Sequence, residues 1–116
     1  MDNEKEATST IRRVRISLNA LKNINEITGY ISILKKQPLN AIKVGDAIFE
    51  MIDRIVENPF AYRECEELAT KSKMYRRAVC FSWLIIYKIT SNEIIILGIT
   101  HGSRRPTQIK KLRNIK

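Results

Sequence analysis

Residues 75–100, YRRAVCFSWLIIYKITSNEIIILGIT, decide the fold of this 116-residue chain. They contain three runs rich in β-branched and aromatic residues, at 75–81, 83–89 and 94–100, which is a composition typical of strands. The runs are separated by a single serine and by a short polar turn, so neighbouring strands must be antiparallel, because a parallel pair needs a long crossover. The middle run is apolar on both faces, and we therefore predict that it is the central, covered strand.

Two amphipathic helices are predicted upstream of this region, because apolar side chains recur there at spacings of three and four residues. The first stripe comprises Leu18, Leu21, Ile24, Ile27, Ile31 and Leu34, and the second comprises Ala41, Gly45, Ile48, Ile52 and Ile55. Ser17 is placed to cap the first helix and Pro38 suits the first turn of the second. Asn58-Pro59 ends the second helix, since the residue before proline is pushed out of the helical region. The short link between the helices predicts an antiparallel hairpin.

Residues 11–16 alternate in polarity and predict a short strand before the helices. The element order is then β-α-α-β-β-β, an α+β fold in which a helical hairpin packs on a twisted antiparallel sheet. Residues 60–74 are polar and predict a loop with at most one helical turn. We expect residues 1–10 to form a flexible N-terminal segment and residues 11–116 to form a single domain with a basic C-terminal tail, because this length supports one core.

The positive charge is concentrated in the second half of the chain. Of the formal net charge of +9, residues 1–58 contribute nine basic and eight acidic side chains, whereas residues 59–116 contribute twelve and four. Segregation of this kind predicts a positive face whose field attracts polyanions or acidic protein segments. The alternative is a solvated surface that only keeps the protein soluble.

Several classes of protein are disfavoured by the sequence. No stretch approaches the ~18 consecutive apolar residues that a membrane span needs. The first ten residues are polar, unlike a secretory signal, which predicts a cytoplasmic protein. Two cysteines, Cys65 and Cys80, are too few for a disulfide framework, and with one histidine they make a poor zinc set. We therefore predict reduced thiols, no metal and no cofactor.

Four motifs together resemble a known family. They are Glu57-Asn58-Pro59-Phe60, Tyr75-Arg76-Arg77-Ala78-Val79, Leu84-Ile85-Ile86-Tyr87-Lys88-Ile89 and Ile99-Thr100-His101-Gly102-Ser103-Arg104-Arg105-Pro106. In their order and spacing they resemble ParE-type toxins of the RelE/ParE superfamily, which includes plasmid stabilisation system proteins. The resemblance runs from Val14 to about Lys111.

This resemblance implies the toxin of a bacterial type II toxin–antitoxin system, held silent in a hetero-oligomer by a cognate antitoxin that wraps its surface. ParE-like members poison DNA gyrase by binding, whereas RelE-like members are metal-independent endoribonucleases that cleave messenger RNA on the ribosome. Many RelE-like nucleases place a tyrosine near the C-terminus, but here no tyrosine follows Tyr87, and His101 is followed by Gly102. The ParE branch is therefore favoured. The alternatives are a RelE-like ribonuclease, and a non-toxic nucleic-acid-binding module or inactive toxin relic.

Arginines are the main candidates for contact with a target or an anion, because a guanidinium matches carboxylate and phosphate oxygens bidentately. Arg76 and Arg77 point to opposite faces of a strand, so at most one faces the helices. The alternative is that the arginine facing the helices forms an internal salt bridge, for which Glu50, Asp53 and Glu57 are the predicted partners. Arg104 and Arg105 lie in a turn flanked by glycine and proline, where we expect a functional contact.

A solvated basic rim that raises association rate and nonspecific affinity more than selectivity is predicted from Lys71 and Lys73, with Lys110, Lys111, Arg113 and Lys116. His101, the only histidine, is a candidate general acid–base, and the alternative is that its imidazole braces the turn at Gly102. In the ribonuclease alternative, His101, Arg77, Arg104 or Lys73 would stabilise a pentavalent phosphate.

Overall fold

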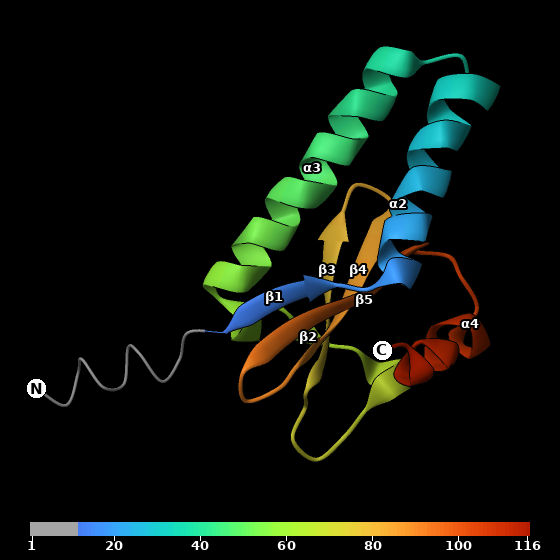
Figure 1. Ribbon diagram of the computed structural model, residues 1–116. Helices are drawn as coiled ribbons and strands as arrows, with labels where there is room; N and C mark the ends of the chain where they lie inside the picture. Colours follow the sequence, from blue (N-terminus) through green and yellow to red (C-terminus); the bar gives the residue numbers. More distant parts are fainter. Residues whose placement is uncertain (1–11) are drawn as a thin grey trace, which may run out of the picture.

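The computed structural model describes residues 12–116, which form a five-stranded sheet with helical segments on both faces (Figure 1). The strands are β1 (Arg13–Ile16), β2 (Arg63–Glu64), β3 (Tyr75–Cys80), β4 (Trp83–Ile89) and β5 (Glu93–His101), and the helices are α2 (Leu18–Gly29), α3 (Pro38–Glu57) and α4 (Pro106–Lys110). Shorter helical turns are η1 (Tyr30–Leu34), η2 (Pro59–Ala61), η3 (Glu66–Leu68) and η4 (Lys111–Asn114). The predicted α+β class is confirmed. The segment 1–10, expected to be flexible, and residue 11 lie outside the described residues.

The sheet is mixed, in contrast to the predicted antiparallel sheet. Its strand order is β1-β5-β4-β3-β2; β3, β4 and β5 are antiparallel neighbours, as predicted, but β1 runs parallel to β5. The physical reason is the long helical connection that follows β1, which allows the chain to return to the sheet with either polarity. Strand β2, which pairs with β3, was not predicted because a two-residue strand has no periodicity.

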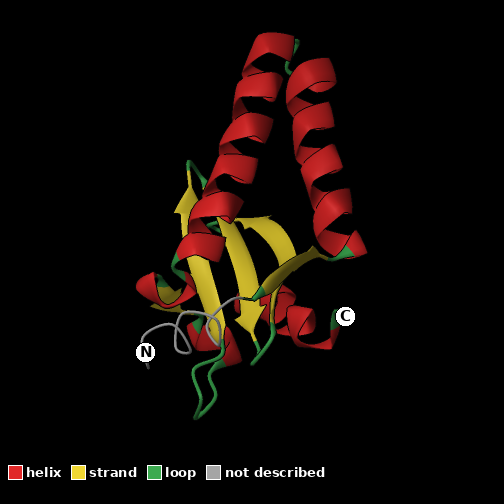
Figure 2. Cartoon of the chain, turned by 60° about the vertical axis from the view of Figure 1, so that its left-hand side comes forward, coloured by secondary structure: helices red, strands yellow, loops and turns green. Residues whose placement is uncertain are grey.

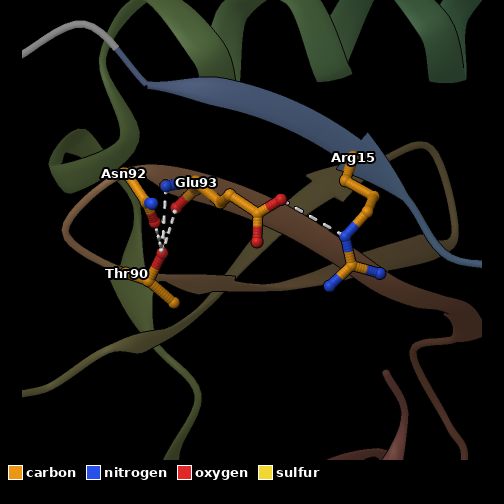
Figure 3. A network of polar contacts seen from close by, with 4 residues as sticks. All are labelled: Arg15, Thr90, Asn92 and Glu93. Atoms are coloured by element: carbon orange, nitrogen blue, oxygen red, sulfur yellow. Dashed lines mark hydrogen bonds and ion pairs between the residues drawn. The ribbon is translucent and has the colours of Figure 1, made fainter.

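The parallel pair is held at one edge by an ion pair. Arg15 Nε on β1 lies 3.4 Å from Glu93 Oε2 on β5, and this is the only ion pair within residues 12–116 (Figure 3). The adjacent turn is closed by Thr90, whose hydroxyl accepts from Glu93 N at 2.9 Å and lies 3.2 Å from Asn92 Oδ1. Both partners of the ion pair are partly exposed, so it sets register more than it adds stability.

The helical hairpin begins and ends at the predicted residues. The Ser17 hydroxyl accepts from Ala20 N at 3.0 Å, Pro38 opens α3, and Asn58 ends it. The first helix continues past Gly29 as a π-helical turn, η1, up to Leu34. Figure 2 shows the two helices running side by side from the sheet and projecting well beyond its edge.

The first core lies between the hairpin and one face of the sheet. Its fully buried residues include Ile48 and Ile55 of α3 and Ile85 and Ile96 of the sheet, each of which contributes roughly 1.5–3 kcal/mol through burial. The predicted first stripe is only partly right, because Leu18 and Leu34 are 84% and 70% exposed. The buried positions of α2 and η1 are Ala20, Ile24, Ile27 and Ile31.

A second core on the opposite face was not predicted. The segments expected to be a polar loop and a basic tail supply Cys65 and Leu68 from the η3 region and Ile109 and Leu112 from α4 and η4. Their sheet partners are Tyr75, Leu84, Ile86, Ile95 and Leu97. Coverage of both faces confirms the prediction that β4 is central and explains why it is apolar on both sides.

Both cysteines are buried and unbonded, Cys65 in the second core and Cys80 in the first. Burial, together with the nearby charge of Glu67, raises the pKa of the Cys65 thiol to about 11. Burial also raises the pKa of Cys80. Because the thiolate is the reactive form, both side chains act as small apolar core residues at neutral pH.

A β-bulge joins the sheet to the start of α2. Ile86 pairs with Gly98 whereas Tyr87 pairs with Ile96, so Leu97 is the extra residue on β5. Side chains of α2 satisfy the bulged backbone: the Ser17 hydroxyl and Asn19 Nδ2 each donate to Leu97 O at 3.0 Å, and Asn23 Oδ1 accepts from Ile99 N at 3.0 Å. Hydrogen bonds thus connect the N-cap and the first two turns of α2 to β5.

Candidate functional site

Arg76 is engaged inside the fold. Its guanidinium donates to the carbonyl oxygens of Lys73 at 2.9 Å, Phe60 at 3.2 Å and Tyr62 at 2.9 Å, and it lies 5.3 Å from the centre of the Phe60 ring. It shares the helix-facing side of β3 with the core residues Ala78 and Cys80. The sequence alternative for an arginine facing the helices was a salt bridge to a carboxylate, but Arg76 instead donates to three backbone carbonyls. Arg76 therefore clamps the segment that follows α3.

The same segment is anchored a second time. The buried Tyr87 hydroxyl donates to Pro59 O at 2.6 Å, and burial raises the pKa of this phenol. The Asn58-Pro59 turn is thus held by one arginine and one tyrosine from neighbouring strands. Arg76, a candidate for target contact in the sequence, is therefore part of the scaffold.

Arg77 lies on the opposite face of β3, as its position next to Arg76 predicts. It is half-buried and is paired in register with Arg63 of β2 and Ile86 of β4. Val79, two residues further along the same face, is 62% exposed. This strip of β3 is cationic at one end and apolar at the other.

His101 braces the turn between β5 and α4. Its Nδ1 lies 2.7 Å from Ser103 Oγ and accepts from Ser103 N at 3.2 Å, and its ring packs edge-on against Trp83 with the centroids 5.3 Å apart. Gly102 N donates to Ser82 O at 2.8 Å, and Arg104 N donates to His101 O at 3.0 Å. The geometry matches the bracing role considered for this residue.

Arg104 and Arg105 follow this turn directly and are exposed. Within residues 12–116, neither guanidinium has a hydrogen-bond or ion-pair partner, in contrast to Arg76. Because the backbone around them is fixed by His101, Ser82 and the start of α4, both arginines project from a rigid base. They are the candidate site residues best placed to receive a carboxylate or phosphate.

Arg104 also lines a polar cleft of about 290 Å³ between α2 and the C-terminal segment. The other polar side chains of its lining are Asn19, Asn23, Glu26, Thr100, Gln108 and Lys111. A neighbouring cleft of about 190 Å³ shares Arg104 and adds Trp83 and Tyr30. These lining residues come from α2, η1, β4, β5 and the C-terminal segment, so no linear motif in the sequence connects them.

Lys71 and Lys73 lie at the other end of the sheet from His101. Lys73 precedes Tyr75, which pairs with Lys88, whereas His101 pairs with Trp83. Five steps of strand separate Trp83 from Lys88, which is about 17 Å at ~3.3 Å per residue. Of the residues named for a ribonuclease site, Arg104 lies beside His101, whereas Lys73 lies at the other end of the sheet, so the set is not brought together around one phosphate. No three His, Cys, Asp or Glu side chains in the described part of the chain form a metal-binding group.

The hairpin carries an exposed apolar surface that the sequence reading missed. Large side chains that are 44–81% exposed run along its distal part: Tyr30, Ile33, Leu34, Leu39, Ile42 and Phe49. Ile33, Ile42 and Phe49 line a groove of about 600 Å³ between the two helices. One feature of the sequence could have indicated this surface, because Ile33 and Leu39 are apolar but lie outside both predicted stripes. We call this surface the hairpin groove.

None of the helices within residues 12–116 combines the length and the apolar character that crossing a membrane requires. Among curated protein sequences, none matches this chain significantly. Among solved structures, a chain described as the chromosomal ParDE TA system from P. aeruginosa is similar in fold, with a TM-score of 0.64 and 17% sequence identity. The match covers 80% of this chain and 98% of that one.

Residues 14–106 match the model of a family described as the ParE toxin of type II toxin–antitoxin system, parDE. The match begins in β1 and ends at the first residue of α4, so it includes the hairpin, β3 to β5 and the turn that carries Arg104 and Arg105. This chain therefore belongs to the ParE toxin family of type II toxin–antitoxin systems.

Proposed function

We propose that this chain is a cytoplasmic, ParE-like toxin that acts by binding, that its target is DNA gyrase, and that a cognate antitoxin neutralises it. The observation that carries the proposal is the family match over residues 14–106. The site geometry supports binding in place of hydrolysis, because Lys73, one of the residues named for phosphate chemistry, lies at the other end of the sheet from His101 and Arg104.

The turn that carries Arg104 and Arg105 is the proposed target contact. Two exposed guanidinium groups on a braced backbone lose little conformational freedom in the backbone when they bind, which favours affinity. Their bidentate geometry suits acidic side chains on a protein partner.

Reversing both charges, in Arg104→Glu with Arg105→Glu, should weaken inhibition of gyrase supercoiling at least tenfold. The loss of ~1.4 kcal/mol that tenfold represents is less than one charge-assisted hydrogen bond usually contributes. The measurement is the toxin concentration that halves supercoiling, with folding verified by circular dichroism. Lys36→Glu with Lys43→Glu, on the far end of the hairpin, changes the net charge by the same amount, is the matched control and should inhibit like the parent chain.

Topoisomerase I assayed on the same plasmid separates gyrase inhibition from coating of the DNA. The proposal requires that gyrase be inhibited at concentrations that spare topoisomerase I. Equal inhibition of both enzymes, or no inhibition of gyrase at high excess, would reject gyrase as the target. Codon-phased cuts in messenger RNA after induction would instead support the ribonuclease alternative.

The hairpin groove is the proposed docking site of the antitoxin. The family to which the chain belongs works in pairs, and an exposed apolar surface of this kind on a small protein marks an interaction site. An amphipathic antitoxin helix would place its apolar side against Ile33, Ile42 and Phe49, as helices do in grooves of this type. The net charge of +9 would draw an acidic antitoxin toward the chain as a whole, whereas residues 18–57, with five basic and five acidic side chains, add no net charge at the groove.

Ile42→Asp should leave the chain folded and toxic but release it from its antitoxin. Ile42 is 60% exposed, so the substitution costs little in the free chain, whereas in the complex it buries an unpaired charge. We expect antitoxin affinity to fall by about a hundredfold or more, or ~2.7 kcal/mol. Co-expression with the adjacent small open reading frame should rescue growth for the parent and for the neighbouring control Lys43→Gln, but not for Ile42→Asp. Full rescue of Ile42→Asp would place the antitoxin on another surface.

A further inference from the structure

The C-terminal segment, residues 102–116, contains six basic residues and no acidic one. The six are Arg104, Arg105, Lys110, Lys111, Arg113 and Lys116, and all of them are exposed. None of the six has an ion-pair partner within the described residues, where Arg15–Glu93 is the only pair. We call residues 102–116 the basic cap. Most of it lies beyond the family match, which ends at residue 106, so target binding by the family does not account for it.

The basic cap is a fixed part of the fold, in contrast to a loose tail. Ile109 and Leu112 are only 3% and 9% exposed because they complete the second core, and Ile115 packs against the same cluster. Because these side chains anchor α4 and η4 to the sheet, the basic residues Lys110, Lys111 and Arg113 are left exposed on a fixed backbone. Charges on a rigid base lose less conformational entropy on binding than charges on a flexible tail.

The positive surface continues from the cap onto the sheet. The guanidinium of Arg113 lies 5.6 Å from the centre of the Tyr75 ring, and Nζ of Lys88 lies 5.7 Å from the same ring. On the side where α4 contacts η3, Glu66 and Glu67 bound the patch. The cleft between α2 and the cap adds neutral donors from Asn23 and Gln108, with Glu26 as its one acidic residue.

Beyond Arg104 and Arg105, which the proposed function assigns to the protein target, α4 and η4 lack what two other kinds of partner need. Single strands are bound through bases stacked on aromatic rings, but Tyr75, the ring within the patch, is only 5% exposed. Protein partners are bound through a central apolar or aromatic anchor, whereas the apolar residues of the cap point into the core. What the cap presents is a set of rigidly held cations, which is how a duplex is contacted through its phosphates.

We propose that the basic cap binds duplex DNA through its phosphate backbone, without reading sequence, as an activity separate from the toxin's action on its target. Affinity of this kind falls with salt in proportion to the number of phosphates neutralised. If about four cations of the cap contact phosphates, log Kd changes with log salt with a slope of about 3.6, and affinity falls roughly 150-fold for a fourfold rise in salt.

The test is fluorescence anisotropy of the full chain with a labelled duplex of about 20 base pairs over a range of salt concentrations. Micromolar binding at low salt is expected, in the range of nonspecific contacts. Lys110→Gln with Lys111→Gln should lower the salt slope by about two, since each phosphate contact contributes about one. Lys36→Gln with Lys43→Gln removes the same charge at the other end of the molecule and should leave the slope unchanged. Glu26→Gln, which removes the acid of the cleft, should tighten binding.

Three results would overturn the proposal. They are no duplex binding at low salt, equal weakening by the cap variant and the hairpin control, and preferential binding of polyglutamate in competition with the duplex. A cap variant that loses duplex binding while still inhibiting gyrase would establish the two activities as separate. Failure of duplex binding with gyrase inhibition intact would reject this inference alone, and the proposed function would stand.

Discussion

Gly98→Val is expected to destabilise the fold by about 4 kcal/mol, which is the largest effect we expect from any single substitution considered. A Cβ at position 98 would lie 3.0 Å from Asn19 Nδ2, 3.0 Å from Leu112 Cδ2 and 3.1 Å from Asn23 Oδ1. These atoms are the ends of side chains, so relief of the contacts requires Asn19 and Asn23 to leave their hydrogen bonds with Leu97 O and Ile99 N, and Leu112 to shift within the second core. Overpacking of this kind costs roughly 1–3 kcal/mol, and loss of two hydrogen bonds, the one that Asn19 donates to Leu97 O and the one that Asn23 accepts from Ile99 N, adds about 1 kcal/mol each.

The measurement is thermal unfolding, in which ~4 kcal/mol corresponds to a fall in Tm of about 16 °C for a domain of this size. Gly98→Ala should show an intermediate fall in Tm, because alanine adds the Cβ atom but not the two γ-carbons of valine. Gly29→Ala is the matched control, since nothing lies within 4 Å of its added Cβ and it sits at the end of a helix. That control should be neutral or stabilising by up to ~1 kcal/mol. A Gly98→Val chain as stable as the parent would show that α2 does not pack on the bulge as described.

Arg76→Met is expected to destabilise the fold by about 3 kcal/mol. The substitution keeps an apolar stem against Phe60 but leaves the carbonyls of Lys73, Phe60 and Tyr62 without their donor. A hydrogen bond to a charged group contributes roughly 1.5–3 kcal/mol, and the total is reduced here because water reaches the more exposed carbonyls. The segment after α3 would then depend on the Tyr87 hydroxyl alone.

Chemical denaturation of Arg76→Met, Arg76→Lys and Arg77→Met separates a scaffold role from a binding role. Lysine should not restore stability, because one ammonium group cannot reproduce the planar fork that reaches three carbonyls. Arg77→Met changes the neighbouring residue on the opposite face and should cost less. If Arg76→Met instead kept full stability and lost only target binding, the clamp would be wrong and Arg76 would belong to the binding surface.

The sequence predicted the elements that have a strong periodic signal. The hairpin, with Ser17, Pro38 and Asn58 at its boundaries, and the three strands between residues 75 and 101 are where hydrophobic spacing and capping chemistry placed them. Local rules were sufficient there, because each helix and each tight strand pair is specified by residues close together in the chain. The second core was not predictable in this way. Leu68 and Ile109 are isolated apolar residues in polar stretches of the sequence, and they come together on one face of the sheet only when the chain folds.

The candidate site likewise has some features that the local sequence predicts and others that only the tertiary structure decides. By itself, the sequence determined that the cations are concentrated in the second half of the chain and that Arg76 and Arg77 face opposite ways, because charge and strand alternation are local properties. Only the tertiary structure decided that Arg76 is engaged by three carbonyls, that Arg104 and Arg105 stay exposed beside a braced turn, and that β1 runs parallel to β5. These outcomes depend on contacts between residues far apart in the chain, and the free energy of such contacts has no signature in local spacing or composition.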